Sequence, residues 1–271
     1  MTTNSFSIAS SWGARQETPA QFGARVLEAL DTFSAISPIF RPWWLFNTSL
    51  AVGNAWKRPK AQHYFSLDYA RHHMTEIVQM GVHRDEGEFP LPVCGYTIVA
   101  MNSQLRSPAT VNFHAHGADS CSDQYRRSAS FKTEFRQVPA PEIVAYPVFK
   151  AVLLALVSIF DVAYARAYSS ELSAQWRRPG PRFLDLSWMT YLSAPLARQI
   201  AIPPDIVTER LENGGLLMIA AQQTFDVNNP EHMQGARSIL QAMAPLNDAA
   251  DKKRRQEQEQ WKKAWLSRPE N

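Results

Sequence analysis

Three consecutive segments in the middle of the chain have the hydrophobic pattern of strands: residues 95–101, 110–116 and 128–135. The first is mostly apolar, whereas the other two alternate between apolar and polar residues. In the third, SASFKTEF, Phe131 and Phe135 fall on one side, opposite Lys132, Glu134 and the following Arg136. Such alternation is typical of antiparallel strands that bury one face and expose the other. The pattern therefore predicts an antiparallel sheet with one face in water.

Apolar residues spaced three or four apart indicate helices. The first predicted helix begins with a capping box, Thr18-x-x-Gln21, with Pro19 at its first position, and apolar residues follow at positions 22, 26, 27, 30 and 33. Ser37-Pro38 is expected to end this helix, because a residue before proline avoids the helical region. Further helices are predicted near residues 69–80, 145–176, 228–243 and 247–266.

Shorter strand-like segments are present at residues 6–12, 183–193 and 214–225. Strands and helices are grouped rather than strictly alternating, which favours an α+β fold in which an antiparallel sheet packs against helices. Since no internal repeat or low-complexity linker divides the chain, we expect one domain over residues 1–247. Residues 248–271 are predicted to form a charged C-terminal helical tail.

The net charge of +3 is concentrated in that tail. Residues 251–271 hold seven Lys/Arg and four Asp/Glu, so the rest of the chain is neutral. A nucleic-acid-binding body usually carries a basic excess across one face, which argues against direct binding of DNA or RNA by the body. The tail alone allows a nucleic-acid-binding or membrane-surface helix as alternatives. We favour a solvated helix whose Trp261, Trp265 and Leu266 side chains pack on the body.

His114 and His116 form the segment that most resembles a catalytic fragment. They lie two apart on a predicted strand, so they share a face with Asn112, and Asp119 and Cys121 follow. A metal-dependent hydrolase centred on the two histidines is therefore an alternative function. The Asp-His pair that should follow a metallo-hydrolase His-x-His is missing, and no other histidine has a spacing that nominates it as a further ligand. We expect no metal, and interpret this strand face as a surface for solvent or a partner.

Motifs of other enzyme classes are also missing from the sequence. Neither Cys94 nor Cys121 lies in a nucleophile motif, and there is no Gly-x-Ser-x-Gly elbow or glycine-rich phosphate-binding loop. We therefore expect no catalytic residues and no cofactor, and predict that the protein is not an enzyme.

The most apolar run, residues 151–160, is shorter than the roughly 20 residues needed to span a bilayer. The N-terminus carries no secretory signal pattern. The sequence therefore predicts a cytoplasmic protein that does not bind membranes.

The most acidic loop contains Asp85, Glu86 and Glu88 around a glycine. Such a loop is usually a solvated turn. It is also the obvious complementary patch for a basic protein partner, because opposite charges steer association. We therefore take these three residues as candidate partner contacts.

The opening of the chain, ASSWGARQETPAQFGARVLEALDTF, resembles the start of the immunity protein 52 family, with Trp12, Gly13, Arg15 and Glu17 matching its motif. The segment GGLLMIAAQQTFDVNNPEHMQGARSILQAM resembles the C-terminal part of that family. The resemblance implies that the chain neutralises a cognate nuclease effector of the Tox-REase-5 type, encoded by a neighbouring gene and delivered by a type VI secretion system. No catalytic residue is carried over.

The motif residues are interpreted as mainly structural, at the corner between the first strand and the first helix. Candidate partner contacts are, besides the acidic loop, His114, His116, Trp12 and Arg15. Because the body is neutral, it does not fit an inhibitor that imitates DNA. The effector contact is expected to be an aromatic patch with a polar rim.

Overall fold

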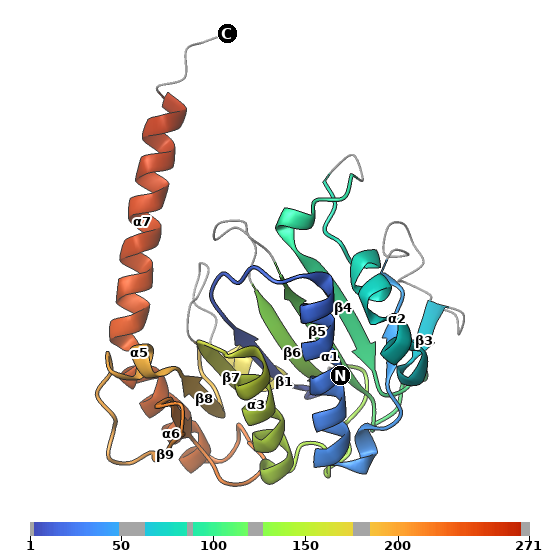
Figure 1. The fold of residues 1–271 in the computed structure, drawn as a ribbon. Coiled ribbons are helices and arrows are strands. Elements are labelled where there is room, and N and C mark those ends of the chain that lie inside the picture. Colours follow the sequence, from blue (N-terminus) through green and yellow to red (C-terminus); the bar gives the residue numbers. More distant parts are fainter. Residues whose placement is uncertain (1–2, 49–62, 86–88, 119–126, 176–184, 267–271) are drawn as a thin grey trace.

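The computed structural model describes residues 3–48, 63–85, 89–118, 127–175 and 185–266, and in the last helix only part of the side chains. Ten strands form one sheet in the order β3-β2-β4-β5-β6-β1-β7-β8-β10-β9. Every described strand pair is antiparallel. The predicted α+β class with an antiparallel sheet is confirmed (Figure 1).

The strands are β1 (Phe6–Ser11), β2 (Trp44–Phe46), β3 (Tyr64–Ser66), β4 (Tyr96–Met101), β5 (Val111–Gly117), β6 (Ser128–Thr133), β7 (Tyr164–Ser169), β8 (Met189–Leu192), β9 (Val207–Arg210) and β10 (Leu216–Ile219). The helices are α1 (Pro19–Ile36), α2 (Leu67–Met80), α3 (Tyr146–Phe160), α4 (Ser170–Gln175), α5 (Ala194–Ala197), α6 (Pro230–Ala242) and α7 (Ala244–Leu266). Within the described residues, 3-10 helices with complete bounds are η1 (Pro38–Phe40) and η5 (Pro92–Cys94).

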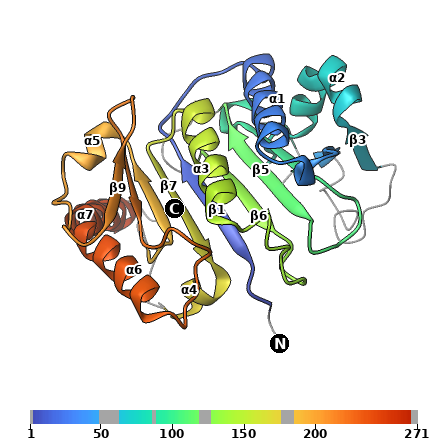
Figure 2. The same cartoon turned by 90° about the horizontal axis from the view of Figure 1, so that it is seen from below.

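Helices α1, α2 and α3 lie side by side on one face of the sheet, and α6 lies against the other (Figure 2). The main core is formed where the first three helices meet the strands, around fully buried Phe22, Phe33, Phe113 and Phe131. A second core lies under α6 and the start of α7, where Ile239, Met243 and Leu246 pack with residues of β8 and β10. Among the described residues, helices therefore cover one face of the sheet from β4 to β8 and β10, and the other face only at the β8 and β10 end.

The start of α1 follows the sequence prediction. The Thr18 hydroxyl accepts a hydrogen bond from the Gln21 backbone N–H at 3.2 Å, and the Gln21 side chain accepts one from the Thr18 N–H at 2.9 Å. This reciprocal pair satisfies two N–H groups that the first helical turn would leave unpaired. Ser37 is the C-cap, so the helix ends where the proline following it predicted.

The long helix expected over residues 145–176 is wrong. Helix α3 ends at Phe160, where Asp161 has a positive φ of 47° and forms a left-handed C-cap. The chain then returns as β7, which pairs with β1 over six residues and with β8 on its other side. Strand β7 forms through pairing with strands that are distant in the sequence, and the local helical pattern of residues 145–176 does not reveal this pairing.

Strand β6 also ends earlier than the alternation predicted. It stops at Thr133, so Glu134 turns inward and Phe135 outward, the reverse of the expected faces. The Phe135 ring is 58% exposed, whereas Phe131 is fully buried.

The tail is helical, as predicted, but α7 begins at Ala244, before the expected domain boundary at residue 247, and that boundary stays a prediction. Figure 1 shows α7 extending away from the sheet and the other helices. The predicted packing of Trp261, Trp265 and Leu266 on the body concerns side chains outside the described part of the chain. Among the described residues, no helix combines the length and the apolar character needed to cross a membrane.

Candidate functional site

The uncovered face of the sheet extends over β4, β5, β6 and β1, and we call it the open face. Its side chains all point away from α1, α2 and α3 and are half-buried or exposed. They are Thr97, Val99, Met101, Asn112, His114, His116, Ser128, Ser130, Lys132, Ser7, Ala9 and Ser11. The predicted polar strand face is therefore part of a surface that spans four strands.

Strand register places the predicted histidines near the middle of the open face. His114 lies opposite Val99 on β4 and Ser130 on β6, while His116 lies opposite Thr97 and Ser128. Small side chains of β6 and β1 flank them on one side. Short side chains provide no walls that could enclose a small molecule, so these strands suit contact with a protein better.

The two imidazoles have different surroundings. His116 Nδ1 is hydrogen-bonded to the Thr97 hydroxyl at 2.9 Å. Desolvation between the neighbouring strands lowers the pKa of His114, and the charge of Lys132 and the nearby His116 lower it further. At neutral pH the open face therefore presents His114 mainly as neutral imidazole, able both to donate and to accept a hydrogen bond.

The hydrolase alternative depends on residues that the structure describes only in part. Asp119 and Cys121 lie outside the described residues. Within the described ranges, no group of three or more His, Cys, Asp or Glu side chains is placed to hold a metal ion. What the described histidines can do chemically is hydrogen-bond to a partner.

The acidic loop is likewise described only in part. Asp85 is exposed, and its carboxylate accepts a hydrogen bond from the Phe89 backbone N–H at 2.9 Å. Glu86 and Glu88 lie outside the described residues. A contact of this loop with a basic partner stays a prediction.

The opening motif clamps the C-terminal end of α3. Trp12 stacks on Phe160 with ring centroids 5.0 Å apart, and the Arg15 guanidinium donates to the Phe160 carbonyl oxygen at 3.1 Å. Arg25 donates to the Ile159 carbonyl oxygen at 2.8 Å. Cations suit a helix C-terminus, where carbonyl groups have no partner within the helix.

Buried Glu17 joins the two arginines of this clamp. Its carboxylate lies 2.7 Å from Arg25 Nε and 4.0 Å from Arg15 Nη1. The side chains of Trp12 and Glu17 are each 6% exposed, so these residues offer little surface to a partner. Contact of Trp12 or Arg15 with a toxin stays a prediction. Their contacts with the end of α3 give the motif a structural role.

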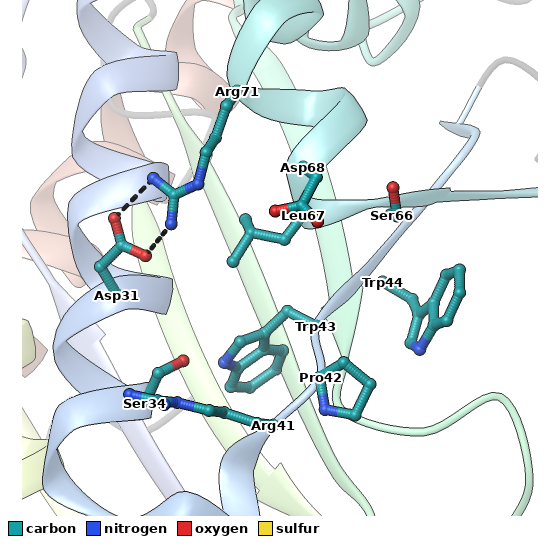
Figure 3. A pocket seen from close by; sticks show the side chains of 10 residues that line it. All are labelled: Asp31, Ser34, Arg41, Pro42, Trp43, Trp44, Ser66, Leu67, Asp68 and Arg71. Atoms are coloured by element: carbon teal, nitrogen blue, oxygen red, sulfur yellow. Dashed lines mark hydrogen bonds and ion pairs between the residues drawn. The ribbon is translucent and has the colours of Figure 1, made fainter.

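A pocket of about 460 Å³ opens between α1, α2 and residues 41–44. Figure 3 shows the Arg71 side chain reaching from α2 to Asp31 on α1. The guanidinium donates two hydrogen bonds to this carboxylate, one of them at 2.9 Å, and the bonding to Asp31 raises the pKa of Arg71. The two charges neutralise each other, and Arg41 and Asp68 are further charged residues of the pocket lining. This pocket was not predictable from the sequence, because its walls come from three separate segments.

Sequence reasoning identified Asn112, His114 and His116 but missed the small residues beside them. Ser7 and Ala9 on β1, and Ser130 on β6, place short side chains beside the histidines. The small residues at alternate positions, 7, 9 and 11 of FSIASS and 128 and 130 of SASFKT, were the available signal, and only the strand order shows that they are next to the histidines.

The sequence matches the family described as immunity protein 52 over residues 4–249, nearly the whole chain. Among solved structures it is similar to one titled "Pseudomonas aeruginosa T6SS protein PA0821", with 10% identity and a TM-score of 0.49. That similarity covers 88% of this chain and 73% of the other, and it is too weak to carry an argument about function. A search of curated proteins gives no match.

Proposed function

Because the chain belongs to the immunity protein 52 family, we propose that it binds and neutralises a cognate antibacterial toxin in the cytoplasm of the producing cell. The toxin is a nuclease of the Tox-REase-5 type, encoded by a neighbouring gene and delivered by a type VI secretion system. These finer features rest on the family resemblance. Inhibition is by stoichiometric binding and requires neither catalysis nor a cofactor.

The observation that supports a binding function is the open face. A single sheet is covered by helices on one side, yet four adjacent strands on the other side expose small and polar side chains around His114 and His116. Such a surface allows a partner to approach closely over several strands. Of its cations, Lys132 lies among neutral residues, whereas the neighbouring Arg166 of β7 is paired with the Asp185 carboxylate at 3.1 Å. A near-neutral surface of this composition fits a specific protein partner better than it fits nucleic acid.

The proposal is tested by expressing the protein together with the toxin of the neighbouring gene. We expect a complex of defined stoichiometry in size-exclusion chromatography with light scattering, and survival of cells that produce both proteins. A catalytically inactive toxin serves for the binding measurement. Nuclease activity on plasmid DNA, measured with increasing amounts of the immunity protein, should fall to zero at the stoichiometric ratio.

The variant Ser130→Arg, which places a large charged side chain on the open face, tests whether the toxin binds there. It is compared with the wild type at equal expression. Loss of both binding and rescue by this variant, with an unchanged circular dichroism spectrum, supports the open face as the contact. If the wild-type chain neither binds the toxin nor rescues cells, the proposed function is wrong. A stoichiometric transition metal in the purified protein would instead favour the hydrolase alternative.

A further inference from the structure

Two loops near the start of β1 each carry an exposed apolar residue followed by an arginine. One loop joins β4 to β5 and carries Leu105, which is 79% exposed, and Arg106. The other follows β6 and carries Phe135, 58% exposed, and Arg136. We call these four residues the loop-end patch. Its second loop continues directly from Lys132 on the open face, so the two surfaces adjoin along β6.

The first loop is held firmly by hydrogen bonds. The buried Asn102 side chain donates to the carbonyl oxygens of Ile39 and Ala109, both at 2.9 Å, and accepts from the Val111 N–H at 2.8 Å. The Thr110 hydroxyl donates to the Leu105 carbonyl oxygen at 2.9 Å. The exposed position of Leu105 is therefore set by a braced turn, although an apolar side chain gains nothing from contact with water.

The second loop is tied to the first and to the N-terminal segment. The Thr3 hydroxyl donates to the Phe135 carbonyl oxygen at 2.6 Å, and the Arg136 N–H donates to the Glu134 carboxylate at 3.2 Å. The Ala140 N–H donates to the Pro108 carbonyl oxygen at 2.9 Å, which joins the two loops. A partner that binds here meets a surface already ordered, which reduces the entropy lost on association.

Both guanidinium groups of the patch lie against one ring. The guanidinium carbon of Arg136 is 5.0 Å from the Phe135 centroid and that of Arg106 is 5.9 Å from it. Arg106 also lies 4.0 Å from the buried carboxylate of Glu134, the acid nearest to the patch in the described contacts. Two cations and one buried acid leave a positive surface around an exposed aromatic ring.

We propose that the loop-end patch is the energetic centre of the toxin contact, and that it binds an acidic surface of the toxin in which carboxylates surround an apolar depression. This inference rests on the proposed function. Phe135 and Leu105 enter the depression, while Arg106 and Arg136 donate hydrogen bonds to the carboxylates. Exposed aromatic and arginine side chains on a rigid frame are the composition that dominates binding energy in protein interfaces.

The test measures binding of the inactive toxin from the neighbouring gene by surface plasmon resonance. Phe135→Ala is expected to raise the dissociation constant at least about 30-fold, the loss of affinity typical of an interface hot spot. The charge reversal Arg136→Glu should weaken binding at least about tenfold, mainly through slower association, and the difference should shrink at high salt. Arg136→Lys retains the charge and should keep more of the affinity than Arg136→Gln.

Phe89→Ala is the matched control, because Phe89 is a phenylalanine of comparable exposure, 70%, located beside the acidic loop. We expect it to bind like the wild type. Leu105→Ser provides an independent second variant in the other loop, with an expected loss of about fivefold or more. Thermal unfolding of every variant verifies that the fold is intact.

The outcomes separate the two proposals. If the wild type binds and the Phe135, Leu105 and Arg136 variants bind equally well, the loop-end patch is not the contact and the proposed function stands. If Phe89→Ala loses affinity while Phe135→Ala does not, the contact is beside the acidic loop and the inference is overturned. If the wild type does not bind the toxin, both proposals are contradicted.

Discussion

The two ends of one sheet differ in how many of their faces are covered. In β8 and β10 every residue is buried, because α3 lies on one side and α6 with the start of α7 lies on the other. In β5, buried and accessible residues alternate. We refer to β8 and β10 as the covered end and to β4, β5, β6 and β1 as the open end.

A single cross-strand row runs through both ends. It begins at Met218 on β10, passes Thr190 on β8 and Arg166 on β7, and continues to Ser130 and His114 at the open end. All these side chains point to the same face, yet Thr190 is fully buried and His114 is exposed. Position along the sheet therefore decides whether a residue stabilises the fold or is available to a partner.

At the covered end, helix α6 packs very close to β10. A Cβ atom at Gly235 of α6 would be 2.6 Å from the Ala220 carbonyl oxygen, next to the end of β10. Glycine at this position lets the helix backbone approach the strand. No comparable helix covers the four strands of the open end within the described residues. The same sheet face is therefore buried at the covered end, where it stabilises the fold, and accessible at the open end, where we propose that a partner binds.

The largest effect is expected from placing the same residue at two points of the shared row. Thr190→Arg puts an unpaired charge into the covered end and should lower the free energy of unfolding by at least about 3 kcal/mol. Ser130→Arg, on the same face at the open end, should change it by less than about 1 kcal/mol. Urea denaturation followed by tryptophan fluorescence measures both. Equal destabilisation by the two variants would contradict the distinction between the ends.

An intermediate effect is expected at Asn102, which anchors the loop beside the open face. Asn102→Leu leaves the carbonyl oxygens of Ile39 and Ala109 without their donor and the Val111 N–H without its acceptor. The free energy of unfolding should fall by about 1–3 kcal/mol. Ser103→Ala, at the half-buried neighbouring position, is the control and should cost far less, because its two hydrogen bonds involve exposed groups of Leu105. The same urea titration detects the difference. An unchanged stability for Asn102→Leu would mean that the open end does not depend on this anchor.

The smallest effect is expected from the histidines. Because the pKa of His114 is lowered in the folded protein, the unfolded chain takes up the proton more readily, so His114 reduces stability as the pH falls below its ordinary pKa of about 6.5. His114→Ala should leave stability within about 0.5 kcal/mol of the wild type at pH 7.5 and lessen the loss at pH 5. Urea titrations at the two pH values measure this. A greater loss at pH 5 in the variant would show that the sign is wrong.

The double variant with His116→Ala should keep the fold and an unchanged metal content.

Local signals in the sequence were sufficient for the elements with strong caps or clear alternation. The capping box at Thr18, the helical pattern near residues 228–243 and the alternation of β5 all predicted elements that the structure contains. The motif residues Trp12 and Arg15 were correctly placed at a corner, but their role in holding the end of α3 depends on residues far away in the sequence. Short strands such as β2 and β9 were missed, because three or four residues carry too little pattern.

The sequence by itself determined the α+β class, the first and last helices, the strands around the histidines and the family. Only the tertiary structure decided that residues 164–169 form a central strand, that Phe135 points outward, and that one end of the sheet is covered twice while the other stays open. The physical reason is that residue periodicity reports which side chains share a face, and this is a local property. Whether that face is then buried depends on which distant helix packs on it, a choice made by long-range contacts such as those of α6 with β10.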